Sequence, residues 1–223
     1  MLTIGEPSLR RAYIGTRLAV SLIVVGLAAV ALALLVTGPL APLLSRDLDG
    51  PGSSFFAQAP FGASLFRRVG ALGDPAVAGS IMIVVGTVVG VRAHRWAPLS
   101  AGVAALLGAI VITSVVRQAT TRSAGYGPIG GFPSGHVMAA ASVFGTLALL
   151  AVGSELPRSV KWLVVVLGVA VPLAVAWSRL ALLDHVPSDV IGGVLLGAAW
   201  AAAVVRAIRV PPCRHEGARA SRR

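Results

Sequence analysis

The stretch PSGHVMAAASVFGTLALLAV (residues 133–152) decides the fold, because a short polar opening leads into a long apolar run without charge. A helix needs about 20 mostly apolar residues to cross the hydrocarbon core of a bilayer. Residues 134–152 therefore predict a membrane-spanning helix. Five further apolar runs of similar length cover residues 18–36, 76–91, 99–116, 160–180 and 187–207. The sequence thus predicts an all-α integral membrane bundle of six transmembrane helices.

The overall composition agrees with a membrane protein. Of the 223 residues, 56% are hydrophobic and only 12% are charged, whereas about 25% charged residues is typical of soluble domains. The net charge of +11 would suggest nucleic-acid binding in a soluble protein. Here the basic residues stand mainly at the ends of apolar runs, so we expect them to orient the bundle and expect no nucleic-acid partner. The single cysteine, Cys213, allows neither an intrachain disulfide nor a metal site built of several thiolates.

The basic residues lie unevenly on the two sides of the predicted bundle. With a cytoplasmic N-terminus, thirteen of the nineteen Lys and Arg residues fall on the inner side and six on the outer side. Because cytoplasmic loops are enriched in these residues, both termini are predicted to be cytoplasmic. The expected organisation is a cytoplasmic N-terminal segment (1–17), a six-helix domain (18–207) with an outer loop (38–73), and a basic cytoplasmic tail (208–223).

The outer loop and the helix interfaces carry residues that allow more than one interpretation. Four phenylalanines, Arg67 and Arg68 in the loop predict either an amphipathic segment in the outer interface or a connecting loop packed on the helix ends. The glycine pairs 86/90 and 193/197 have a small-xxx-small spacing, which favours packing within one subunit, with a homodimer as the alternative. The tryptophans at positions 96, 162, 177 and 200 stand near run ends and are predicted to anchor the helices at the interface.

Three outer segments hold polar residues of the kind that membrane proteins keep for function. They are Arg117 with Arg122, the segment 133–136 and the segment 178–189. In the six-helix topology all three fall on the same side of the membrane. The sequence therefore predicts one polar site at the outer end of the bundle.

Two helix starts carry clear signals. Asp74 and Pro75 precede the run 76–91 and are typical of a cap followed by a first-turn proline. In the second, Ser134 is a natural N-cap, and the free N–H groups and positive dipole end of the helix suit an anion such as phosphate. Gly135 lets an anion approach the backbone, and His136 can act as acid or base near neutral pH. The alternative is a plain capped helix with a histidine at the membrane edge.

The last of the three segments contains a second histidine. His185 and Asp189 stand at i and i+4, so they can share a helical face if the intervening turn permits it. A carboxylate bonded to one ring nitrogen fixes the tautomer and leaves the other nitrogen free to attack. Arg179 offers a planar fork for phosphate oxygens. The alternative is a structural ion pair of Arg179 with Asp184 or Asp189.

The motifs Pro133-Ser134-Gly135-His136 and Ser178-Arg179-x5-His185-x3-Asp189 resemble the second and third signature motifs of the type-2 phosphatidic acid phosphatase family. Vanadium haloperoxidases share this pocket. The resemblance implies a nucleophilic His185 that forms a phosphohistidine, an orienting Asp189 and an acid/base His136. It implies no metal or other cofactor. The implied phosphate-binding residues are Arg117, Arg122, Ser134, Gly135 and Arg179.

The first signature motif departs from the family pattern of Lys, six residues, then Arg-Pro. Arg117 takes the Lys place, whereas Ala124 and Gly125 stand where Arg and Pro are expected. Arg122 lies two residues earlier, so Arg117 and Arg122 are still expected to bind phosphate. Either Arg67 or Arg68 of the outer loop compensates for the missing arginine, or the substrate carries a different head group.

The resulting hypothesis is a membrane phosphatase that hydrolyses a lipid phosphate or diphosphate at the extracytoplasmic face. Polyprenyl diphosphate, phosphatidylglycerophosphate, phosphatidate and a polyprenyl phospho-sugar all fit as substrates. One alternative is a metal-dependent hydrolase built on His136, Asp184, His185 and Asp189, although the arginines would repel a cation. The other is a lipid-phosphate-binding membrane protein with an impaired site, suggested by the altered first motif.

Overall fold

The structure is a computed structural model that describes residues 7–57, 62–93, 96–119 and 131–208. Within these ranges the chain contains helices and no strand. The helices are α1 (Pro7–Thr37), α2 (Ala41–Leu44), the π-helix η1 (Ser45–Asp49), α3 (Gly50–Ala57), α4 (Ala63–Ala71), α5 (Pro75–Ala93), α6 (Ala97–Ala119), α7 (Gly135–Val152), α8 (Arg158–Ala181) and α9 (Pro187–Ile208).

The six long helices coincide with the six apolar runs of the sequence. Five of them, α1, α6, α7, α8 and α9, are long and apolar enough to cross a membrane. The pair α4 and α5, bent by 52°, makes a sixth span if it is counted as one. The prediction of an all-α membrane bundle is therefore confirmed. The hydropathy pattern did not predict the short helix α4 that precedes α5.

Helix α7 is the centre of the bundle and packs against α6, α8 and α9, while α1 covers α6 and α9. Two close approaches explain the contact between α7 and α9. A Cβ on Gly193 would lie 2.9 Å from the carbonyl oxygen of Ser134, and one on Gly197 would lie 2.8 Å from that of Met138. These glycines therefore pack within one subunit, as expected. A homodimer stays a prediction.

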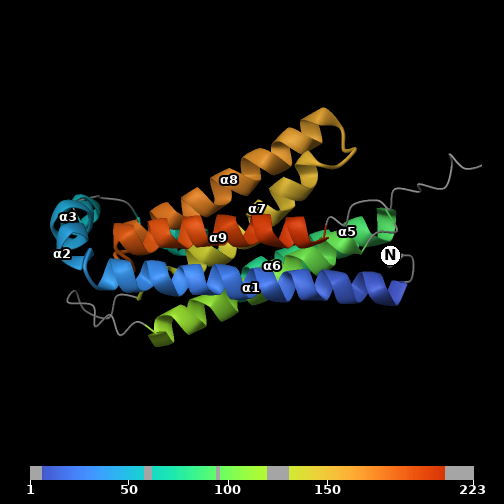
Figure 1. Cartoon of the computed structure of the whole chain (residues 1–223). Helices are drawn as coiled ribbons and strands as arrows, with labels where there is room; N and C mark the ends of the chain where they lie inside the picture. The colour runs from blue at the N-terminus through green and yellow to red at the C-terminus, as the bar shows by residue number, and fades with distance from the viewer. Residues whose placement is uncertain (1–6, 58–61, 94–95, 120–130, 209–223) are drawn as a thin grey trace, which may run out of the picture.

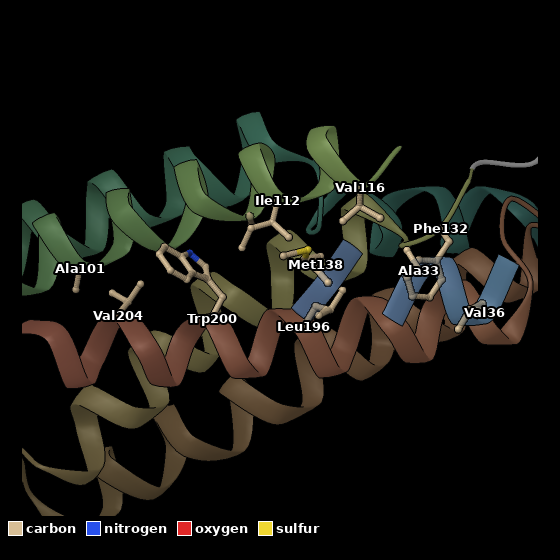
Figure 2. Close-up of a cluster of buried hydrophobic side chains, with 12 residues drawn as sticks. Ala33, Val36, Ala101, Ile112, Val116, Phe132, Met138, Leu196, Trp200 and Val204 are labelled. Atoms are coloured by element: carbon tan, nitrogen blue, oxygen red, sulfur yellow. The ribbon is translucent and has the colours of Figure 1, made fainter. Parts of the chain in front are cut away.

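Figure 2 shows the largest cluster of buried hydrophobic side chains among the described residues, to which α1, α6, α7 and α9 contribute and in which Trp200 lies between α6 and α9. The indole N–H of Trp200 lies 3.2 Å from the carbonyl oxygen of Ala104 and 3.0 Å from that of Ala105, and the residue is only 2% exposed. A Cβ on Gly108 would lie 2.2 Å from the ring, so the glycine provides the space for it. The prediction that Trp200 anchors the bundle at the interface is therefore wrong.

Residues 38–73, called the outer segment below after the predicted topology, are largely helical where the structure describes them, and they pack on the end of the bundle where α9 begins (Figure 1). Phe56 of α3 meets Trp177 of α8 edge to face, with ring centroids 4.9 Å apart. Helix α4 packs along the end of α8. The segment thus matches the expectation of a loop packed on the helix ends. Phe55 and Leu65 are more than 60% exposed, and their contact with the membrane interface stays a prediction.

Candidate active site

Four helix ends meet at the end of the bundle that carries the outer segment: the end of α6, the start of α7, the end of α8 and the start of α9 (Figure 1). They surround a cavity of about 450 Å³, together with the first residue of α5. The antiparallel course of these helices brings the three polar segments together, although they are far apart in sequence. The lining residues are Pro75, Ala109, Ile110, Thr113, Ser114, Arg117, Gly135, His136, Ala139, Arg179, Asp184 and His185.

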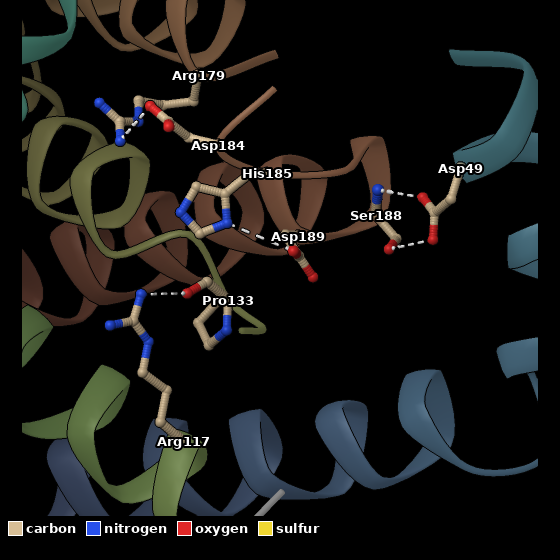
Figure 3. A network of polar contacts seen from close by, with 8 residues as sticks. All are labelled: Asp49, Arg117, Pro133, Arg179, Asp184, His185, Ser188 and Asp189. Carbon is tan, nitrogen blue, oxygen red and sulfur yellow. Dashed lines mark hydrogen bonds and ion pairs between the residues drawn. The ribbon is translucent and has the colours of Figure 1, made fainter. Parts of the chain in front are cut away.

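His185 and Asp189 form a buried pair at the start of α9. The distance from His185 Nδ1 to Asp189 Oδ2 is 3.4 Å, and the two side chains are 4% and 3% exposed. The Asp189 carboxylate lies in the first turn of α9, where the helix dipole stabilises negative charge. Figure 3 shows the other ring nitrogen of His185 on the side away from Asp189, and His185 lines the cavity. The pair is therefore arranged to present Nε2 to a ligand.

Arg179 is ion-paired at the other side of this histidine. Its Nη2 lies 2.6 Å from Asp184 Oδ2, so the ion pair that the sequence left as an alternative is present. The turn between them includes Leu183 in the left-handed region, with φ of 55°. The Nε of Arg179 is buried and has no hydrogen-bond partner among the residues that the structure describes. One edge of the guanidinium is thus held by Asp184, while an N–H remains for a further acceptor.

His136 is more open than His185. Its Nε2 lies 4.0 Å from Asp74 Oδ2, and the two side chains are 32% and 45% exposed. Asp74 also caps α5, as expected, by accepting the N–H of Ala76 at 2.8 Å. A Cβ on Gly73 would lie 2.5 Å from the carbonyl oxygen of His136, so the turn before α5 packs directly on the start of α7. Sequence reasoning identified Asp74 only as a cap and missed its place beside His136.

The start of α7 differs from the expected cap in one respect. Ser134 occupies the N-cap position with extended backbone, but its hydroxyl makes no capping hydrogen bond. Its Oγ is fully buried and without a partner among the described residues. The Ser134 N–H donates to the carbonyl oxygen of Asp189 at 3.0 Å, which ties α7 to α9. The Ser134 hydroxyl is therefore a buried polar group without a hydrogen-bond partner among the described residues, next to the backbone of Asp189.

Arg117 approaches the same helix start from α6. Its Nη2 lies 3.5 Å from the carbonyl oxygen of Pro133, and a Cβ on Gly135 would lie 3.4 Å from the same nitrogen. The glycine therefore keeps the space beside the guanidinium open. Arg122 and the altered motif positions 124 and 125 lie outside the described residues.

Asp49 of the outer segment contacts Ser188 of α9, and sequence reasoning missed this contact. Its carboxylate is 2% exposed and accepts both the N–H and the hydroxyl of Ser188, each at 2.8 Å (Figure 3). Ser188 precedes Asp189, so η1 holds the first turn of α9 in place. The two partners are 139 residues apart in the chain.

The described residues contain no group of three His, Cys, Asp or Glu side chains that could hold a metal ion. Arg117 and Arg179 line the cavity together with the two histidines and Asp184. The alternative of a metal-dependent hydrolase thus has no ligand cluster within these ranges.

Two comparisons with known proteins bear on the family and the fold of this chain. A family model described as the PAP2 superfamily matches residues 113–210, a range that begins in the cavity and includes α7, α8 and α9. The crystal structure of a transmembrane PAP2-type phosphatidylglycerolphosphate phosphatase from Bacillus subtilis is similar, with a TM-score of 0.67 and 21% sequence identity. The match covers 83% of this chain and 94% of that one, and at this identity it concerns the fold. No curated protein sequence gives a significant match.

Proposed function

We propose that the chain is a type-2 phosphatidic acid phosphatase that hydrolyses a lipid phosphate or diphosphate at the extracytoplasmic face through a phosphohistidine. The PAP2 superfamily model that matches residues 113–210 supports this proposal. In coarser terms it is a multi-pass membrane protein and a lipid phosphatase. The observation that carries the proposal is the buried pair of His185 and Asp189, of which His185 lines a cavity together with two arginines and a second histidine.

In the first step, His185 attacks phosphorus. Asp189 holds the proton on Nδ1, so the lone pair on Nε2 forms the P–N bond while the bond from phosphorus to the lipid oxygen breaks. His136 gives its proton to the leaving oxygen. The products are a phosphohistidine and a lipid alcohol, or a lipid monophosphate when the substrate is a diphosphate.

In the second step, water replaces the histidine. His136, now neutral, takes a proton from water, and the water oxygen attacks phosphorus. The P–N bond breaks, its electron pair returns to Nε2 of His185, and inorganic phosphate leaves. Both histidines end in their starting protonation states, so the cycle needs no metal and no other cofactor.

The charge on the phosphoryl oxygens is offset by the residues around the histidines. Arg179 contributes the N–H groups that Asp184 does not occupy, and Arg117 reaches the cavity from α6. Gly135 lines the cavity and leaves room at the positive end of α7. Ser134 does not line it, and we propose its buried hydroxyl as a phosphate ligand by family resemblance. We propose Arg122 as a further ligand by family resemblance alone.

The shape of the cavity supports a lipid substrate. Ala109 and Ile110 line it and lie about two turns before Arg117 on α6, which places them about 10 Å deeper along a membrane helix. Ile110 is 39% exposed, so this wall is apolar and open to the side. A hydrocarbon chain can pack there while the phosphate remains among the arginines.

The reaction is tested by incubating the purified protein with a panel of lipids in EDTA. The readout is inorganic phosphate or, for the phospho-sugar, which is a phosphodiester, the released lipid. The panel contains polyprenyl diphosphate, phosphatidylglycerophosphate, phosphatidate and a polyprenyl phospho-sugar. We expect hydrolysis of at least one lipid in EDTA and complete loss of it in His185→Ala. Activity that survives this substitution would contradict the phosphohistidine, and activity that needs an added metal would contradict metal independence. Binding of vanadate without turnover of any lipid would favour a binding protein instead.

The proposed topology places both termini in the cytoplasm and the cavity outside. Cys213, the only cysteine, lies in the basic tail and provides a natural probe. A maleimide that does not cross membranes should label Cys213 only after intact cells are permeabilised. The matched control is Ser54→Cys in a Cys213→Ser background, because Ser54 is exposed on α3 at the cavity end and should react in intact cells. The reverse pattern would invert the topology.

A further inference from the structure

A second cavity, of about 610 Å³, adjoins the first on the side of the outer segment. His136, Arg179 and Asp184 line both cavities, so these residues form the border between them. His185 lines only the first. The other residues of the second cavity are Arg67, Ala71, Asp74, Val77 and Leu182.

Helix α4 brings Arg67 to this cavity. Arg67 and Ala71 stand at i and i+4, and Gly70 lies between them on the same side of the helix. A Cβ on Gly70 would lie 3.2 Å from Nη1 of Arg179, so α4 packs directly against that guanidinium. Arg68 follows Arg67 in sequence but does not line the cavity. Of the two loop arginines, therefore, only Arg67 faces the site.

Two arginines, Arg67 and Arg179, line the second cavity, and they differ in whether a carboxylate of the described residues pairs with them. Asp184 is paired with Arg179 at 2.6 Å. Asp74 accepts the Ala76 N–H with one oxygen and approaches His136 with the other. Among the residues that the structure describes, no carboxylate forms an ion pair with Arg67. The buried Nε of Arg179 adds an unused donor at the border.

We propose that the second cavity binds the second phosphate of a lipid that carries two phosphate groups, with Arg67 as its ligand. The inference rests on the proposed function, in which His136 protonates the leaving oxygen. In a lipid with two phosphates the leaving group itself carries a phosphate, and that phosphate must lie close to His136, where the two cavities meet. A lipid with a single phosphate leaves as an alcohol and brings no charge to Arg67.

The test compares substrates that differ by one phosphate. One pair is a polyprenyl diphosphate and the matching monophosphate, and the other is phosphatidylglycerophosphate and phosphatidate with the same acyl chains. In Arg67→Gln we expect kcat/KM to fall about tenfold for the two-phosphate member of a pair, mainly through KM, because one charge-assisted hydrogen bond is lost. The one-phosphate member should change less than twofold. Arg68→Gln, on the same helix, is the matched control and should leave all four substrates unchanged.

The two pairs also separate two sources of the second phosphate. A selective loss only in the polyprenyl pair supports a subsite for a directly linked phosphate, and a selective loss only in the phospholipid pair supports one for a phosphate spaced by glycerol. An equal loss on both members of each pair, or no loss on any, would overturn the role of Arg67 while leaving the phosphatase intact. If the unaltered protein hydrolyses none of the four lipids, the proposed function fails and the inference fails with it.

Discussion

The two histidines of the cavity stand in opposite surroundings. His185 is buried, and its partner Asp189 is fixed in the first turn of α9 by contacts with α7 and with the outer segment. His136 is half-open, and its nearest carboxylate, Asp74, belongs to the turn before α5 and is itself 45% exposed. One side of the cavity is thus buried among packed helix ends, and the other is open and borders α4 and the turn before α5.

This difference suggests a division of labour. A nucleophile needs one tautomer and one direction of attack, and burial in packed helix ends provides both. An acid that serves the leaving group must border the space where the rest of the substrate lies, and His136 borders both cavities. Variation in substrate choice is therefore expected on the side of α4 and α5, and the chemistry is expected to depend on α9.

The largest effect is expected from Asp189→Asn. The substitution keeps the size of the side chain but loses the carboxylate charge that fixes the tautomer of His185 and stabilises the positive charge on its ring once Nε2 is phosphorylated, so kcat should fall about a thousandfold. The measurement is phosphate release on the preferred lipid, with thermal unfolding as the control for folding. If kcat falls less than tenfold in a folded variant, His185 is not the nucleophile.

A smaller effect is expected from Asp49→Ala. This substitution tests whether the outer segment holds the first turn of α9, and with it Asp189, in place. The substitution removes the carboxylate that accepts the N–H and the hydroxyl of Ser188, and the loss of these two hydrogen bonds should lower the free energy of unfolding by about 1–3 kcal/mol. We also expect kcat to fall about tenfold with little change in KM, because the first turn of α9 loosens. The readouts are thermal unfolding in detergent and steady-state kinetics.

Asp47→Ala is the matched control for this variant. Asp47 lies in the same short helix, but its side chain is 67% exposed and its pair with Arg46 spans 3.7 Å. Exposed pairs of this kind contribute little, so stability and kcat should both stay unchanged. Equal effects of the two substitutions would mean that the contact with Ser188 has no special role.

The smallest effect is expected from Asp74→Asn, on the open side. Asparagine can still accept the N–H of Ala76, so the cap remains while the charge beside His136 is removed. We expect kcat to fall about threefold and unfolding to be unaffected, since the groups are partly exposed. Asp74→Ala should show the same kinetic loss and also destabilise the protein by about 1 kcal/mol. A thousandfold loss of kcat in Asp74→Asn would mean that the reaction depends on Asp74 as strongly as on Asp189.

Much of the fold was predictable because its signals are local. Each membrane helix is visible as an apolar run, and Asp74 with Pro75 marked the start of α5 correctly. The spacing of His185 and Asp189 predicted a shared face, and the structure brings their side chains within 3.4 Å. Their catalytic roles remain predictions. Ser134 shows the limit: the pattern predicted its N-cap position, but not that its hydroxyl makes no cap bond.

The sequence did not predict the contacts between segments that lie far apart in the chain. The position of Trp200 near the end of an apolar run predicted an interface anchor. In the structure its ring packs against Gly108, where no side chain occupies the space, and it is buried in the core. Arg67 and Arg68 were equivalent as neighbouring arginines. Only the packing of α4 on α8, which Gly70 permits, separates one from the other.

The sequence by itself determined that this chain is a helical membrane protein with its polar motifs at one end, because hydropathy and helical spacing depend only on nearby residues. The tertiary structure decided which polar groups meet. It placed Asp49 on Ser188, Asp74 beside His136 and Arg67 at the second cavity. Such pairings depend on how closely helices approach and on where an outer segment folds back, and these are properties of the whole bundle rather than of any one stretch of it.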